Sequence, residues 1–118
     1  MNDDIYLLLQ ISEKLNSKIV TLARCLILAL LSYFVDGIQF RELKAALKMS
    51  DGKLISNLNE LKEMGYVEKA EVEVDNRKVD VYSLTGKGRN ELSKIIEWMK
   101  LVEKVSNEGD RKCLILTR

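Results

Sequence analysis

The side chains of this chain that could do chemistry are hydrogen-bond donors and cations, and the most informative group follows Ser50. Lys53, Ser56 and Asn59 lie on one face of a predicted helix, where each can donate a hydrogen bond to a base edge in a DNA groove. Ile55 on the same face can contact the methyl group of thymine. The alternative is that these are ordinary solvent-exposed residues of an amphipathic helix.

Cations flank this helix on both sides in the sequence. Arg41 opens the preceding helix, and Lys44 and Lys48 flank the turn, which are positions suited to holding phosphate. Arg77 and Lys78 are predicted at the tip of a later hairpin, where they could meet backbone phosphate or the minor groove. Ordinary solvation of a charged turn is the alternative. The predicted DNA-binding set is Arg41, Lys44, Lys48, Ser50, Gly52, Lys53, Ile55, Ser56, Asn57, Asn59, Asn76, Arg77 and Lys78.

The composition excludes most catalytic and metal chemistry. The chain has no His, so Ser/His/Asp and Cys/His catalysis are ruled out. Its two cysteines, Cys25 and Cys113, cannot form a structural zinc site unless carboxylates supply the other ligands. The sequence also has no glycine-rich phosphate loop. We therefore expect no catalytic residue, no metal, no cofactor and no enzymatic activity.

The elements that must position the polar side chains form a helix-turn-helix. Phe40–Leu47 is predicted as a two-turn helix and Lys48-Met49 as the turn. Ser50 is a favourable N-cap for the next helix, and Gly65 stands where a C′ residue ends it. In this motif the second helix fits the DNA major groove.

Two strands are predicted to follow, because apolar and charged residues alternate over Tyr66–Val74 and again over Val79–Leu84. The turn is predicted at Asp75–Lys78, with Asn76 at positive φ. Ile38-Gln39 can add one short strand. Such a hairpin forms a wing beside the helix-turn-helix, although its many acidic residues are unusual for a surface that meets phosphate. These acidic residues are Glu68, Glu71, Glu73, Asp75 and Asp80.

The two ends of the chain are predicted to be helical. Asp3 or Asp4 caps an extra N-terminal helix at 5–16, and Thr85 caps a long C-terminal helix at 86–106. Their apolar stripes are wider than one small domain can cover, which favours a homodimer. The alternative is that the two helices pack on each other within one subunit. The predicted dimer interface comprises Ile5, Leu8, Leu9, Leu15, Leu92, Ile95, Ile96, Met99 and Val102.

Length and charge set the remaining bounds. The 118 residues are predicted to form a single winged-helix domain at 1–118, with its core at 18–85 and a tail of unassigned role at 107–118. The net charge of +1 gives no overall attraction to nucleic acid. Ile19–Val35 is strongly apolar, but it is at the lower length limit for a membrane span and contains Arg24. We predict that Lys18–Phe34 is a buried central helix, and that the protein has no membrane partner.

These residues resemble the winged-helix transcriptional regulators, and most closely the small MarR/ArsR-like proteins of archaea and bacteria. The resemblance covers roughly Lys18 to Leu92. It rests on Phe40-x-x-Leu43, on Met49-Ser50-Asp51-Gly52-x-Leu54-x-x-x-Leu58-x-x-Leu61-x-x-x-Gly65-Tyr66-Val67 and on Tyr82-Ser83-Leu84-Thr85-x-x-Gly88-Arg89. The chain departs from the family pattern at Ile55-Ser56-Asn57-Leu58, where Ser-x-His-Leu is usual, and it lacks the metal-sensing cysteines of arsenic-type regulators.

The expected fold class is α+β and mostly helical: a winged helix-turn-helix with an extra N-terminal helix and a long C-terminal dimerisation helix. The resemblance implies a homodimer that binds double-stranded DNA sequence-specifically and regulates transcription. The alternative function is a winged-helix protein–protein interaction module within a transcription or other assembly, which the neutral charge and acidic wing support. The absence of a disulfide framework favours the cytoplasm. No residue indicates an effector ligand.

Overall fold

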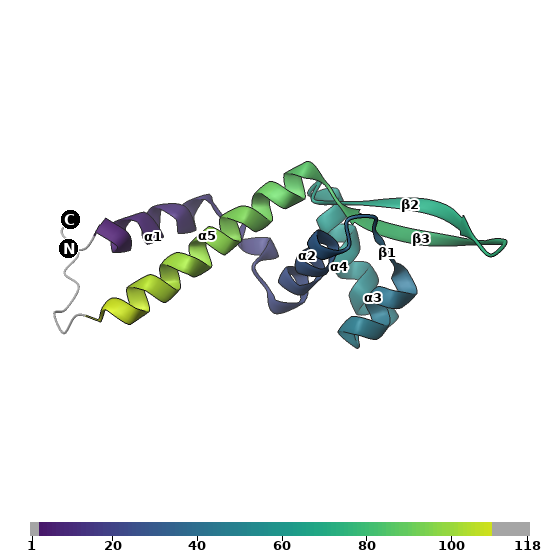
Figure 1. The fold of residues 1–118 in the computed structure, drawn as a ribbon, viewed down its shortest axis with the longest axis horizontal. Coiled ribbons are helices and arrows are strands. Elements are labelled where there is room, and N and C mark those ends of the chain that lie inside the picture. The colour runs from purple at the N-terminus through teal and green to yellow at the C-terminus, as the bar shows by residue number, and fades with distance from the viewer. Residues whose placement is uncertain (1–2, 110–118) are drawn as a thin grey trace. The chain divides into compact units, whose positions relative to one another are not determined.

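The computed structural model describes residues 3–109, which belong to two compact units. One unit runs from Asn16 to Leu92, and the other combines the chain up to Leu15 with the chain from Ser93 onward. The first unit contains, in order, η1 (Ser17–Ile19), α2 (Leu22–Tyr33), β1 (Ile38–Gln39), α3 (Phe40–Leu47), α4 (Asp51–Glu63), β2 (Val67–Val74), β3 (Arg77–Leu84) and the start of α5 (Gly86–Glu108) (Figure 1). This order of elements confirms the predicted winged-helix fold.

The predicted helix over Lys18–Phe34 is wrong at its beginning. The structure has the short 3-10 helix η1, followed by a break at Val20 and Thr21, before α2 starts at Leu22. The cause is local capping. The Thr21 hydroxyl accepts a hydrogen bond from the Arg24 amide at 3.2 Å and holds Thr21 extended, so that a new helix begins there.

The helix-turn-helix, α3 and α4, forms where its capping residues predict. The Ser50 hydroxyl accepts a hydrogen bond from the Lys53 amide at 3.2 Å and caps α4. At the other end Gly65 has φ +83°, and the amides of Tyr66 and Gly65 donate to the carbonyls of Leu61 and Lys62. This pair of bonds is a Schellman motif, which ends α4 and directs the chain into β2.

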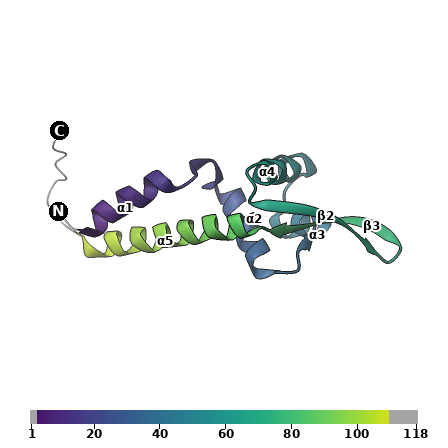
Figure 2. The ribbon, with the colours of Figure 1, turned by 90° about the horizontal axis from the view of Figure 1, so that it is seen from above.

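The wing is a tight antiparallel hairpin of β2 and β3, and β1 pairs with the other edge of β3. Figure 2 shows the hairpin running out beyond α3 and α4. The turn consists of Asp75 and Asn76 at φ +50° and +64°, which confirms the positive φ of Asn76. The predicted turn was too long, however. Arg77 and Lys78 belong to β3, because the backbone twist of a two-residue turn lets pairing begin at once with Val74↔Arg77.

The core of this unit joins the helices to the base of the wing. Leucines and isoleucines of α2, α3 and α4 pack together, and Val67 of β2 is buried with them. Gly88 of α5 closes the core from the side of the hairpin, because a Cβ built there would lie 2.1 Å from the Tyr66 carbonyl oxygen. The fully buried side chains of this unit include Ile19, Ile27, Leu28, Leu31, Leu43, Leu54, Leu58 and Leu61.

The second unit pairs α1 (Asp3–Lys14) with the long part of α5 in an antiparallel arrangement (Figure 1). The Trp98 indole N–H donates to the Ser12 hydroxyl at 2.8 Å, and Lys104 lies 3.0 Å from the Asp4 carboxylate. The hydrogen bond from Lys104 lowers the pKa of Asp4 below its ordinary value. The helices predicted at 5–16 and 86–106 are both present, and their observed bounds are Asp3–Lys14 and Gly86–Glu108.

The predicted dimer-interface residues differ in how exposed their side chains are to solvent. Leu92 and Ile95 are buried in the single chain, and Ile5, Leu8 and Leu15 are half-buried. The members that remain exposed are Leu9, Ile96, Met99 and Val102. Cys113 and most of the predicted tail at 107–118 lie outside the described residues.

Candidate nucleic-acid interface

The outward face of α4 presents small and polar side chains to solvent. Leu54, Leu58 and Leu61 are fully buried, which fixes the inner face of the helix. Gly52, Ser56 and Asn59 stand at helical spacing on the outer face and are exposed, as are Lys53 and Ile55. The predicted base-reading residues are thus brought together on one capped helix. Ser50 differs, since its hydroxyl serves as the N-cap.

Asn57 is the predicted contact whose side chain is most fully engaged within the protein. Its amide nitrogen donates to the Lys53 carbonyl at 2.9 Å, and its amide oxygen accepts from Arg24 Nε at 2.9 Å. Such bonds hold the amide on the flank of α4. In the sequence Arg24 is noticeable only as a charge within an apolar run, because nothing near it indicates a partner on α4.

The cations around the turn have different surroundings. Lys44 lies 2.8 Å from the Asp51 carboxylate in the first turn of α4, so much of its charge is balanced locally. Lys48 is exposed and takes the left-handed conformation at φ +54°, where it ends α3. Arg41 is exposed in the first turn of α3.

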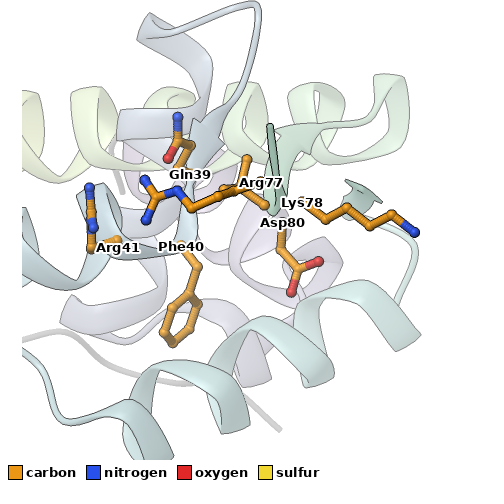
Figure 3. A pocket seen from close by; sticks show the side chains of 7 residues that line it. Gln39, Phe40, Arg41, Arg77, Lys78 and Asp80 are labelled. Carbon is orange, nitrogen blue, oxygen red and sulfur yellow. The ribbon is translucent and has the colours of Figure 1, made fainter. Parts of the chain in front are cut away.

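A cationic pocket of about 230 Å³ lies between the start of α3 and the outer part of β3. Figure 3 shows the guanidinium group of Arg77 directed toward Gln39 and Arg41, whereas Lys78 points away from them. Lys78 instead lies 3.8 Å from Glu71 of β2. The residues that line the pocket are Gln39, Phe40, Arg41, Arg77, Lys78, Val79 and Asp80.

The sheet and an aromatic contact hold the two sides of this pocket together. Gln39 pairs with Val81 across β1 and β3, so α3 begins directly beside the wing strand. The Phe40 ring lies 6.4 Å from the ring of Tyr82, whose pKa is raised by burial and by the nearby Asp80 carboxylate. Gln39 is the N-cap of α3 but makes no side-chain capping bond, and the positive end of the helix dipole at this terminus favours an anion.

The pocket depends on residues that the sequence analysis did not group. Arg41 and Arg77 were both predicted to contact DNA, but as parts of separate elements. Gln39 and Phe40 were not predicted as site residues. The signal available in the sequence was the short strand at Ile38-Gln39, whose pairing with β3 brings α3 to the wing.

The described residues offer little for catalysis or metal binding. Across residues 3–109 there is no group of three or more His, Cys, Asp or Glu side chains placed to hold a metal ion. No helix within the same range is long and apolar enough to cross a membrane. Cys25 is half-buried, and burial raises the pKa of its thiol.

Comparison with known proteins places this geometry in context. A family model described as "Winged helix DNA-binding domain" matches residues 23–102, which include both helices of the helix-turn-helix and the whole wing. An uncharacterised protein of Methanocaldococcus jannaschii is 33% identical over 87 residues, covering 70% of this chain and 94% of that protein.

Solved structures share the fold at lower identity. A transcriptional regulator homologue from Pyrococcus horikoshii superposes with a TM-score of 0.69 at 20% identity, covering 88% of this chain and 97% of that one. A cysteine-to-serine mutant of MarR from Escherichia coli superposes with a TM-score of 0.66 at 22% identity, covering 92% of this chain and 78% of that one.

Proposed function

Because this chain belongs to the winged helix DNA-binding domain family, we propose that it is a homodimeric regulator of transcription that binds double-stranded DNA sequence-specifically. The observation that carries the proposal is the outer face of α4. Its small and polar residues are exposed on a helix whose other face is held by buried leucines, which suits insertion into the major groove. We place this function in the cytoplasm and assign no effector.

We assign base reading to the outer face of α4. Ser56 and Asn59 can exchange hydrogen bonds with base edges, Lys53 can donate to guanine, and Ile55 can contact a thymine methyl group. Gly52 leaves room for the helix to approach the groove closely, since nothing lies within 4 Å of a Cβ built there. We expect a small contribution from Asn57, because Arg24 and the Lys53 carbonyl occupy its amide.

Phosphate binding falls to the pocket between α3 and β3. Arg41 and Arg77 line this pocket beside the start of α3, and their two guanidinium groups outweigh the one Asp80 carboxylate that also lines it, which suits one backbone phosphate. A phosphate held there would join the helix-turn-helix to the wing. Lys48 adds more distant positive charge. Lys78 lines the pocket but its amino group lies near Glu71, and the charge of Lys44 is reduced because Asp51 lies beside it.

The proposal of a homodimer rests on apolar surface. Leu9 of α1 and Ile96, Met99 and Val102 of α5 are exposed large apolar side chains within the unit that pairs these helices. Contiguous exposed apolar surface marks interfaces. A two-fold dimer would carry two copies of α4 about 34 Å apart, one turn of DNA, so each half-site would be read by one subunit.

The acidic wing favours a second candidate, a protein–protein interaction module. Glu68, Glu71 and Glu73 are exposed along β2 and would repel phosphate. A basic protein segment could bind there instead. The two candidates differ in the dependence of duplex binding on salt.

The experiment is a titration of a labelled random duplex with the protein at several salt concentrations. For a DNA-binding protein the logarithm of the association constant falls linearly with the logarithm of the salt concentration, with a slope of about −0.9 per phosphate contacted. We expect such a slope. A protein that binds no duplex at low salt would be the interaction module instead.

A further inference from the structure

Arg24 is a largely buried charge in the first part of α2, and its side chain reaches α4 through directional bonds. Only 14% of the side chain is exposed. Its Nη1 donates to the Lys18 carbonyl at 2.5 Å and its Nε donates to the Asn57 amide oxygen at 2.9 Å. Its Nη2 forms an ion pair with the Glu60 carboxylate. One guanidinium therefore joins η1 and α2 to α4.

The two residues of α4 that Arg24 contacts, Asn57 and Glu60, lie one helical turn apart on one flank of the helix. This flank borders the outer face that carries Lys53, Ser56 and Asn59. The Asn57 amide nitrogen also donates a hydrogen bond to the Lys53 carbonyl in the preceding turn of α4. Arg24 therefore contacts α4 directly beside the proposed base-reading face.

These bonds fix the rotation of α4 about its own axis, which the apolar core does not fix. The buried leucines of α4 hold the helix against the domain, but apolar contacts are non-directional and permit small rotations of a helix about its axis. A guanidinium that bonds two side chains one helical turn apart specifies one rotation, because its donors have a fixed planar geometry. A rotation of α4 would move Ser56 and Asn59 away from their base edges.

Arg24 also restrains two side chains beside the outer face of α4. It holds the Asn57 amide on the flank and balances the Glu60 carboxylate, which is 52% exposed. Without Arg24, Asn57 would be free to bond other groups and Glu60 would present an unbalanced negative charge near the phosphates.

We propose that Arg24 is a positioning and specificity-determining residue for DNA recognition, which sets the rotation of α4 and withdraws Asn57 and Glu60 from the DNA-reading surface. This inference rests on the proposed function. It assigns Arg24 no contact with DNA itself.

The test compares two affinities for each variant: for a preferred duplex selected from a random pool, and for a random duplex at the same salt concentration. In Arg24→Met the ratio of the two should fall about tenfold, since misplaced base contacts affect only the preferred site. Arg24→Lys should lose nearly as much of this ratio, because lysine keeps the charge but not the planar fork. Lys62→Met is the matched control. It removes one exposed charge from α4 and should leave the ratio unchanged.

A double variant separates positioning from charge. Arg24→Met alone should also lower the affinity for both duplexes to the same extent, because the Glu60 carboxylate is left unbalanced near the phosphates. In Arg24→Met with Glu60→Gln that carboxylate is gone, so the affinity for random DNA should return to the parental value while the ratio stays low. The amide resonances of residues 53–60 should also shift in Arg24→Lys without DNA, which shows that the surroundings of α4 depend on the guanidinium. If Arg24→Met does not fold, Arg24→Lys carries the same test.

The outcomes distinguish this inference from the function on which it rests. A parent that prefers no sequence contradicts the proposed function. A parental preference that persists in Arg24→Lys and Arg24→Met contradicts the role of Arg24 alone, even if the melting temperature falls, since Arg24 would then serve stability only.

Discussion

The outer face of α4 makes a specific prediction about single residues. Replacing Ser56 or Asn59 by Ala removes hydrogen bonds to base edges, and should weaken the preferred site by about 1–3 kcal/mol while random duplex is bound nearly as before. Competition binding with the two duplexes measures both affinities. Asn90→Ala is the control, since Asn90 is an exposed helical asparagine of α5. Equal losses on both duplexes would argue that these residues do not read bases.

The cationic pocket predicts that two neighbouring cations of β3 differ in importance. Arg77 points toward Arg41 in the pocket, whereas Lys78 lies near Glu71. Arg77→Ala should therefore reduce affinity for every duplex and flatten the salt slope by about one unit, the effect of one lost phosphate contact. Lys78→Ala should have a smaller effect. The salt titration described above measures both, and similar small effects in the two variants would exclude a phosphate in this pocket.

Cys25 allows a prediction about pH. Burial raises the pKa of its thiol, so at pH 8 less thiolate is present than in an unfolded chain. Alkylation of Cys25 by iodoacetamide should be slower in the native protein than in urea and should accelerate as pH rises above the ordinary thiol pKa. Peptide mass spectrometry identifies the modified residue. Equal rates in the native and unfolded protein would show that Cys25 is exposed.

At the scale of the elements, two glycines of α5 form a matched pair. A Cβ at Gly88 would lie 2.1 Å from the Tyr66 carbonyl oxygen and 2.7 Å from Leu84 Cδ1, whereas one at Gly86 would meet nothing within 4 Å. Gly88→Ala should separate α5 from the base of the wing and reduce the free energy of unfolding by about 1–3 kcal/mol or more. Gly86→Ala should be neutral. Urea unfolding measures both, and equal stabilities would mean that α5 does not pack closely there.

The elements whose ends depend on local chemistry were predictable from sequence. Ser50, Gly65 and Thr85 mark helix boundaries through bonds to their own neighbours, and the structure has those bonds. The break before α2 was missed, because the apolar run continues through Val20 and Thr21 and hides the cap. A pattern of hydrophobicity does not show where a hydroxyl will bond.

The contacts between distant elements were not predictable in the same way. Arg24 bonds residues more than thirty positions away, and the Arg41–Arg77 pocket exists only because β1 pairs with β3. The sequence indicated Arg41 and Arg77 as separate candidates and did not indicate Arg24 as a site residue. Their grouping depends on pairing partners and side-chain directions, which a single sequence does not specify.

At the scale of the whole molecule, the exposed apolar residues of α5 predict assembly. Burying a large apolar side chain between subunits contributes roughly 1.5–3 kcal/mol. Met99 is 50% exposed, so Met99→Glu should shift the dimer toward monomer and lower the affinity for DNA without changing α4. Lys100→Glu is the control, since it places the same charge at the adjacent exposed position. Sedimentation at micromolar concentration measures the state, and a monomeric parent would contradict the dimer.

Selection from a random duplex pool shows whether α4 recognises a specific sequence of duplex DNA in a two-fold assembly. The protein is mixed with the pool at physiological salt, the bound duplexes are recovered over several rounds, and their sequences are compared. We predict a palindromic site with half-sites about one helical turn apart, enriched less strongly by Asn59→Ala. Recovery of sequences no different from the starting pool would contradict sequence-specific recognition by α4.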